Sequence, residues 1–417
     1  MKLNILLNLI PLMLCAFMIP ATAQSPIHYV VATPGEDASS SVAVNWHCFK
    51  EGSFLELKDA SARDFRKSRR FFPSQKLWSL DPQYVTDSLF TRERYVCSVV
   101  MDGLMRNHKY EYRVVCGEQT SPVQSFRTAS GKNTWSFAAF TDFQPVDNDR
   151  TGAMIDKVLA FAGKEVPLAV CSGDMVDYSA REGNWKWLFD NAPMGKFLFA
   201  SSPGDHEYWG AVKPDGHISQ LPVPEPYNTM FTFPDNGLDE RKNSSFWFRY
   251  NNVLFVALDM GDSNTSKCEM FQKEVEWFKN TIFPLKGTYT YLIVLEHKGI
   301  FGSYASDSGV SKNLRPLWAP VFREAGVDLV LCGHDHMFHR SVPIAGTTYL
   351  GMGTSGKKRR VPDDGLYNDG LQAKVINLPE TDQCMGALID VSPQCLDVTV
   401  IDLSGTVVDS FRVPVRE

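Results

Sequence analysis

Carboxylates and imidazoles recur in this chain directly after apolar runs. The segment Gly333–Arg340, GHDHMFHR, places three histidines within six residues, immediately after the apolar run VDLVLC. A buried strand does not need imidazoles for packing. Carboxylate oxygens and imidazole nitrogens together are ligands that suit iron, zinc and manganese. The segment therefore indicates a metal site.

Four other apolar runs, WSFAAF, PLAVC, KFLFA and YLIVL, also end near such residues. The candidate metal ligands along the chain are Asp142, Gln144, Asp174, Asp205, His297, His334 and His336. Ligands bind outside the carboxyl ends of strands in open α/β sheets, so these side chains are expected to converge. The set is too large for one ion and suits two ions that share a carboxylate. Such a pair activates water and holds a phosphoryl group.

Each motif taken alone is also compatible with an ordinary structural role. A lone Gly-Asp is usually a turn, and a lone histidine such as His297 usually serves packing or lies on the surface. Five such motifs at successive strand ends make coincidence improbable. The glycines Gly173, Gly204 and Gly333 are expected to let the backbone turn sharply as it leaves each strand.

Hydrophobic patterning divides the chain into two parts. From Pro26 to about Thr128, short alternating runs such as SVAVNW and YEYRVVC are separated by turn residues, which predicts a β-sandwich. After the linker SGKN, apolar strands alternate with helical patterns, which predicts a layered α/β domain with a buried sheet. The tail from about Gly386 alternates again and is expected to form a second sheet.

Length and composition narrow the class of protein. A chain of 417 residues favours two domains. A net charge of −6 argues against nucleic acid as the main partner, because phosphate contacts need a basic face. The first residues resemble a signal peptide, with cleavage expected before Gln24 and a membrane anchor as the alternative. We therefore expect a periplasmic or secreted protein with no membrane span after cleavage.

With these residues in place, the sequence resembles the calcineurin-like metallophosphoesterases, and within them the purple acid phosphatase-like branch. The family pattern is Asp-x-His, Gly-Asp, Gly-Asn-His-Asp/Glu, His and Gly-His-x-His, and the five blocks occur here in order, with departures at Gln144 and Asp205. The branch also carries an N-terminal fibronectin III-like domain, and DGLMRNHKYEYRVV followed by SFRT is similar to its end. The resemblance implies a signal peptide over 1–23, a fibronectin III-like sandwich over 24–130 and a four-layer α/β/β/α phosphoesterase domain over 131–417.

The resemblance also implies a role for each candidate. Asp174 would bridge two divalent or trivalent ions of iron, zinc or manganese. The remaining ligands would divide between the ions, with Asp142 and His336 on the first and Asp205, His297 and His334 on the second. His206 would be the acid beside the centre that protonates the leaving oxygen or stabilises the transition state. A metal-bound hydroxide would be the nucleophile on a phosphate mono- or diester.

Three departures from the family pattern bear on activity. Gln144 stands where the wider family has histidine, and Asp177 stands where the purple branch has a tyrosine ligand. Purple colour is therefore not expected, and the first ion is held weakly or by Gln144. Asp205 replaces asparagine and adds a negative charge, which would repel a phosphate dianion and favour a diester monoanion. Tyr178 and Tyr208 are candidate walls of the substrate pocket, with ordinary aromatic packing as the alternative.

Two interpretations of function follow from the sequence. The first is an exported, metal-dependent phosphoric ester hydrolase, either a phosphatase or a phosphodiesterase. The alternative is a non-catalytic or single-metal degenerate phosphoesterase that binds a ligand or partner. Asp177 and Gln144 favour the alternative slightly, whereas the retained Asp174, His206 and Gly-His-x-His motif favour the enzyme.

Overall fold

The N-terminal part of the chain is built from two antiparallel sheets. The computed structural model describes residues 25–85, 90–145, 150–260, 268–302, 308–356, 371–376 and 384–416. The first sheet has the order β1 (Ile27–Pro34), β2 (Val42–Cys48), β6 (Arg94–Met101), β5 (Ser74–Trp78). The second contains β4 (Arg69–Phe71), β3 (Phe54–Asp59), β7 (Lys109–Cys116), β8 (Gln119–Thr120) and β9 (Gln124–Arg127). The β-rich N-terminal part predicted from alternation is confirmed, and β7 shows the alternating burial that the pattern predicts.

Two larger sheets form the C-terminal part. The six-stranded sheet has the order β12 (Leu198–Ser201), β11 (Leu168–Cys171), β10 (Trp135–Phe140), β22 (Met385–Val391), β23 (Cys395–Asp402), β24 (Val407–Pro414). The seven-stranded sheet has the order β15 (Phe246–Tyr250), β16 (Val253–Ala257), β17 (Tyr291–Leu295), β18 (Leu329–Cys332), β20 (Thr348–Met352), β19 (Phe338–Ser341), β21 (Gln372–Ile376). Strands β10 to β12 run parallel, as do β16, β17, β18 and β20.

The C-terminal tail does not form a sheet of its own, contrary to the sequence-based expectation. Strand β22 pairs antiparallel with β10, so the tail extends the sheet that β10 begins. Alternation of side chains predicts strands but does not specify which neighbour each strand will pair with.

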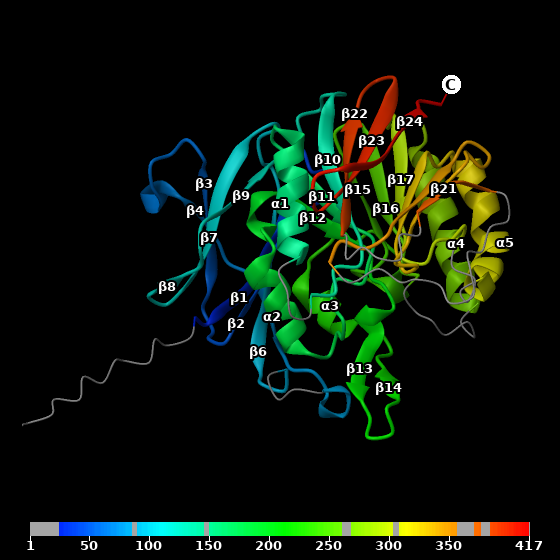
Figure 1. The fold of residues 1–417 in the computed structure, drawn as a ribbon. Helices are drawn as coiled ribbons and strands as arrows, with labels where there is room; N and C mark the ends of the chain where they lie inside the picture. The colour runs from blue at the N-terminus through cyan, green and yellow to red at the C-terminus, as the bar shows by residue number, and fades with distance from the viewer. Residues whose placement is uncertain are drawn as a thin grey trace, which may run out of the picture.

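The two sheets pack against each other and helices cover their outer faces (Figure 1). Apolar side chains from both sheets, such as Phe137, Phe255 and Ile389, belong to one buried core. Helices α1 (Arg150–Ala162) and α2 (Glu182–Asn191) lie on the outside of the six-stranded sheet. Helices α4 (Cys268–Ile282) and α5 (Ser308–Ala325) cover the seven-stranded sheet. This is the four-layer α/β/β/α arrangement predicted from the sequence.

Helix α4 shows why the outer layers form. Its residues Phe271, Val275, Phe278 and Ile282 recur at helical spacing and are all buried against the seven-stranded sheet. The strands beneath, β16 to β18, are continuous apolar runs because they are covered on both faces. Strands β13 (Trp209–Val212) and β14 (Ile218–Gln220) form a hairpin, and α3 (Glu225–Met230) follows it.

Polar contacts join the N-terminal sandwich to the C-terminal part. The buried Arg94 of β6 donates to Glu182 of α2, and Tyr29 of β1 donates to the same carboxylate at 2.8 Å. His47 on β2 donates through Nε2 to the carbonyl of Thr229 in α3 at 2.9 Å. The two parts therefore meet through buried, specific groups and not only through apolar packing.

Two buried cysteines face each other inside the sandwich. Cys48 ends β2 and Cys116 ends β7, in different sheets, and their sulfur atoms lie 3.0 Å apart. Across the described residues, no helix has the length and apolar character needed to cross a membrane. The expected signal peptide lies outside the described residues.

Candidate metal centre

The predicted ligands follow the carboxyl ends of parallel strands in both large sheets. Asp142 and Gln144 follow β10, Asp174 follows β11, and Asp205 follows β12. From the facing sheet, His297 follows β17, and His334 and His336 follow β18. The chain brings all of them to one edge of the paired sheets, as strand polarity predicts.

One group of possible ligands consists of Asp142, Asp174 and His336. One ligand atom from each lies within 4.8 Å of the others, and all three side chains are buried. His336 Nε2 lies 3.0 Å from Asp142 Oδ1. Thr141 donates its hydroxyl to Asp142 Oδ2 at 2.5 Å, which fixes the carboxylate.

A second group consists of Asp205, His297 and His334, again within 4.8 Å. Asp205 Oδ1 lies 3.0 Å from His334 Nδ1 and 3.2 Å from His297 Nε2. His297 Nδ1 lies 2.8 Å from the carbonyl oxygen of Ser172 and donates to it, so Nε2 is the nitrogen that can accept. A carbonyl partner on the far ring nitrogen is the usual arrangement for a metal-bound histidine.

Asp174 links the two groups. Its Oδ2 atom lies 3.2 Å from His297 Nε2, while the same nitrogen lies 3.2 Å from Asp205. His297 Nε2 is fully buried, yet it has no hydrogen bond of proper geometry among the described residues. A buried acceptor between two carboxylates fits a cation, which would satisfy all three groups at once.

The charges around Asp174 and His297 also favour a bound cation. Burial by itself raises the pKa of Asp174, but His206 and His297 outweigh it and hold that pKa at about 2. Burial lowers the pKa of His297, whereas Asp174 raises it, and the raising effect prevails strongly. The centre therefore attracts positive charge, whether this is carried by a proton or by a metal cation.

Gln144 lies beside the first group. Its Nε2 atom donates to Asp174 Oδ2 at 3.0 Å, and the side chain is 1% exposed. Its Oε1 atom is buried without a hydrogen-bond partner among the described residues. A rotation of about 180° around the last side-chain bond exchanges the carboxamide oxygen and nitrogen of Gln144. The oxygen can then face a cation next to Asp174.

The backbone at the centre is held in an uncommon conformation. Of the ten non-glycine residues with positive φ in the described chain, half are predicted ligands: Asp142, Gln144, Asp174, His334 and His336. Their φ values lie between 35° and 69°. This region disfavours side chains with a Cβ, so the surrounding structure must impose it. Backbone hydrogen bonds do so, from Asp142 N to Gly173 O at 3.0 Å and from Gln144 N to Asp174 O at 3.2 Å.

The three glycines serve the centre in two different ways. Only Gly173 has a positive φ, of 95°, as expected for a sharp turn. Gly204 and Gly333 are required for space. A Cβ on Gly204 would overlap Asp174 Oδ1, and a Cβ on Gly333 would overlap Thr141 and Asp142. The expected sharp turn is therefore wrong for Gly204 and Gly333. Glycine is needed at these two positions because neighbouring side chains approach the backbone closely.

Glu207 supports the turn that carries Asp174. Its carboxylate is fully buried and accepts backbone N–H groups from Gly204 at 2.6 Å and from Asp174 and Met175 at 2.9 Å each. Burial and the charge of Asp174 raise the pKa of Glu207 to about 8, while the N–H donors act in the opposite direction. Sequence alone left two roles open for Glu207, orienting His206 or capping a turn. The contacts show the second.

His206 is placed next to the bridging carboxylate. Its Nδ1 donates to the carbonyl of Asp177 at 2.6 Å, which leaves Nε2 facing Asp174 Oδ2 at 3.7 Å. Trp209 stacks on the imidazole with ring centroids 3.6 Å apart. The stacking and the carbonyl fix both the tautomer and the ring plane of His206.

The two tyrosines predicted as pocket walls lie in different surroundings. Tyr178 is half-buried, its ring lies 5.5 Å from that of Trp209, and the guanidinium of Arg181 lies over it. Tyr208 is 3% exposed and donates to Asp259 at 2.8 Å, while Arg241 donates to its oxygen at 2.8 Å. These contacts favour the structural alternative for Tyr208 and place Tyr178 next to Trp209, the residue that stacks on His206.

The third histidine of GHDHMFHR does not join the centre. His339 lies on β19, fully buried, with its ring so close to Gly351 that any Cβ there would overlap it. His336 precedes β19 and has a positive φ, so the chain changes direction between His336 and His339. Sequence reasoning also passed over Lys298, which follows His297 and is 5% exposed next to the second group.

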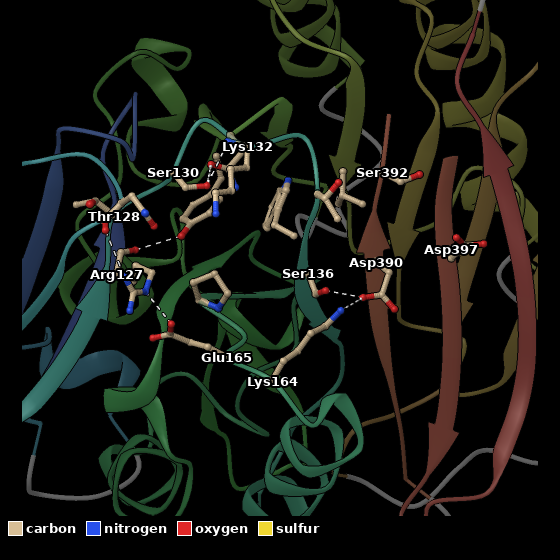
Figure 2. Close-up of a pocket in the computed structure, with 17 residues that line it drawn as sticks. Arg127, Thr128, Ser130, Lys132, Ser136, Lys164, Glu165, Asp390, Ser392 and Asp397 are labelled. Atoms are coloured by element: carbon tan, nitrogen blue, oxygen red, sulfur yellow. Dashed lines mark hydrogen bonds and ion pairs between the residues drawn. The ribbon is translucent and has the colours of Figure 1, made fainter. Parts of the chain in front are cut away.

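A separate cavity of about 510 Å³ lies at the junction with the sandwich, near Trp135 at the start of β10 (Figure 2). Arg127 donates to Glu165 at 2.7 Å, and Lys164 pairs with Asp390 at 2.6 Å. Parallel strands start here, at the opposite end from the predicted ligands, and these two ion pairs offset four of the charges that line the cavity.

Two families match the chain in sequence. Residues 136–338 match the calcineurin-like phosphoesterase family, and residues 27–128 match the N-terminal domain of purple acid phosphatases. The first range contains every predicted ligand, from Asp142 to His336. Two curated uncharacterized proteins from strains of Mycobacterium tuberculosis are each 23% identical over 229 residues, which is 51% of this chain and 41% of each relative. The match thus spans about two fifths of these relatives.

Solved structures share the fold. A purple acid phosphatase, PPD1, from yellow lupin (Lupinus luteus) seeds superposes with a TM-score of 0.68 at 16% identity, covering 94% of this chain and 74% of that one. The structure of PhoD superposes with a TM-score of 0.61 at 13% identity, covering 93% of both chains. At this level of identity the likeness concerns the fold.

Proposed function

The chain belongs to the calcineurin-like phosphoesterases and carries the N-terminal domain of purple acid phosphatases, and from this premise we propose that it hydrolyses phosphate esters at a two-metal centre. One observation carries the proposal. Two groups of three ligands, Asp142–Asp174–His336 and Asp205–His297–His334, lie at the same sheet edge and are joined through Asp174. Two bound cations of iron, zinc or manganese would supply Lewis acidity and lower the pKa of a bound water.

The protein's own side chains have separate tasks in this scheme. Asp174 is proposed to bridge the ions, and Gln144 to complete the first group through Oε1. His206 is proposed to hold a proton at Nε2 and deliver it to the leaving oxygen, because Nδ1 is committed to the Asp177 carbonyl. The stacking of Trp209 on His206 supports this role, because it restricts the orientation of the imidazole.

We also propose that the protein is exported, with residues 1–23 as the signal peptide, a domain over 24–130 and the phosphoesterase domain over 131–417. The support is the lysine, apolar run and small residues at the start of the sequence. N-terminal sequencing of the protein recovered from its native host should begin at Gln24. An intact Met1 would overturn the export proposal and leave the hydrolase untouched.

The first test of the hydrolase is metal content. Mass spectrometry of purified wild type should find close to two transition-metal ions per chain, with a large loss in Asp174→Asn. The same preparations should hydrolyse p-nitrophenyl phosphate only when loaded. Two bound ions without hydrolysis of mono- or diesters would favour a ligand-binding protein on the same centre. A single ion would place the chain with the degenerate alternative.

A further inference from the structure

A buried lysine lies beside the second ligand group. Lys298 follows His297 beyond the end of β17 and is 5% exposed. Its Nζ atom lies 4.0 Å from Asp205 Oδ1. Asp205 is its one ionic partner within the described ranges, and at 4.0 Å this contact is longer than a hydrogen bond. The ammonium of this largely buried side chain has three donors, and none of them makes a hydrogen bond to the residues that the structure describes.

The position of this ammonium has an electrostatic consequence. Asp205 Oδ1 is the same oxygen that approaches His297 and His334. A metal cation held by this group would be repelled by Lys298, so the lysine weakens metal binding there. An anion bound to the metals would instead be attracted by it. Lys298 therefore disfavours the cation and favours an anion at the same place. Its position at the centre indicates that it binds the anion.

The balance of charges supports the same role. The carboxylates Asp142, Asp174 and Asp205 bring three negative charges to a largely buried centre. In the described chain, Lys298 is the one permanently charged cationic side chain within ion-pair distance of any of the three. It offsets part of the charge of Asp205, so the repulsion that this carboxylate would exert on a phosphate dianion is reduced.

We propose that Lys298 binds a non-reacting phosphoryl oxygen of the substrate and thereby favours phosphate monoester dianions over diester monoanions. The inference rests on the proposed hydrolase and adds its substrate class. It reverses the preference that Asp205 alone suggests. The flexible four-carbon stem of lysine allows Nζ to move from Asp205 to a phosphoryl oxygen without a change in the backbone.

The test compares Lys298→Met, Lys298→Arg and wild type after metal loading. Calorimetry should show inorganic phosphate binding about tenfold or more weaker in Lys298→Met, with Lys298→Arg keeping most of the affinity. The ratio of kcat/KM for p-nitrophenyl phosphate to that for bis(p-nitrophenyl) phosphate should fall by a similar factor, mainly through KM. The apparent Kd for Mn²⁺ at the second group, which contains Asp205, should decrease, because a neighbouring positive charge is gone.

The outcomes separate this inference from the proposed function. Lys196→Met, which removes an exposed lysine paired with Asp156, is the matched control and should change none of these quantities. A loaded and active Lys298→Met with unchanged phosphate affinity and unchanged substrate ratio overturns the role of Lys298 alone. A wild type that binds neither metal nor phosphate overturns both proposals. If Lys298→Met does not fold, Lys298→Gln with full metal content replaces it. A lower monoester-to-diester ratio of kcat/KM in this variant supports the role of Lys298, and an unchanged ratio overturns it.

Discussion

At the scale of single residues, the centre depends on groups that never touch a ligand. Glu207 fixes the turn after β11 through three short backbone contacts, and Gly333 leaves room for Asp142. The convergence of these side chains was predictable from sequence, because the carboxyl ends of parallel strands meet at one edge of a sheet. The supporting contacts of Glu207 were not predictable, because a single sequence does not distinguish a buried glutamate from one on the surface.

Replacing Glu207 by glutamine should damage the centre strongly. The amide keeps the shape but presents an NH₂ group to backbone N–H donors, which leaves buried donors facing each other. We expect a loss of about 2–4 kcal/mol in unfolding free energy and of most bound metal. Denaturant unfolding and metal analysis measure the two effects. Glu240→Gln, at an exposed glutamate paired with Lys273, should behave as wild type, and equal effects in both variants would contradict the prediction.

Replacing Gly333 by alanine should displace Asp142 while the rest of the fold persists. The added Cβ overlaps Asp142 Oδ2 and the Thr141 hydroxyl. We expect metal content to fall from about two ions towards one, since the second group does not include Asp142. Metal analysis together with circular dichroism checks this. Full metal content in a folded variant would show that the strand end can shift without cost.

At the scale of elements, short apolar runs of sequence correctly predicted where strands form. They did not predict which strands pair with each other. The tail strands β22 to β24 were identified as strands but assigned to the wrong sheet. Their partner β10 is more than two hundred residues away in sequence, and no local pattern encodes such a pairing. The sulfur contact between β2 and β7 was likewise beyond reach, because the eight cysteines that follow the expected cleavage site permit many connectivities.

Oxidation should join Cys48 to Cys116 and couple the two sheets of the sandwich. Oxidised glutathione would take the two electrons and two hydrogens, and the cysteines would form one disulfide. A cross-link over 68 residues should add on the order of 2–4 kcal/mol to unfolding free energy. Peptide mapping and melting curves with and without reductant measure it. An oxidised Cys48→Ala variant that gains the same stability would show that another cysteine pair is responsible.

At the scale of the whole molecule, stability should depend on the junction between the two parts. His47 is fully buried there, with Nε2 donating to Thr229 and with Tyr29 and Trp78 against the ring. Burial lowers the pKa of His47 to about 3, although the hydrogen bond to Thr229 raises it. Between pH 6.5 and about 3 the unfolded chain therefore binds a proton that the folded chain does not.

This difference predicts how acid affects folding. As the pH falls below about 6.5, His47 should cost the metal-free protein about 1.4 kcal/mol of stability per pH unit until its folded pKa is reached. His47→Gln keeps an N–H donor for Thr229 and cannot titrate, so its stability should fall less steeply from about pH 6.5 to about pH 5. Denaturant unfolding of both proteins at several pH values measures the slopes. Parallel slopes would mean that His47 is protonated in the folded chain.

Each of the two ligand groups takes residues from both large sheets. Asp142 and His334, which meet through a backbone N–H, are 192 residues apart in sequence. The sheets must therefore be docked before a complete group exists, and an unfolded or half-assembled chain has little affinity for the ions. Binding that is confined to the docked state pulls the folding equilibrium towards that state as the free metal concentration rises. Metal supply would then set the chain's resistance to proteolysis as well as its activity, so that scarcity removes the protein itself and not only its catalysis.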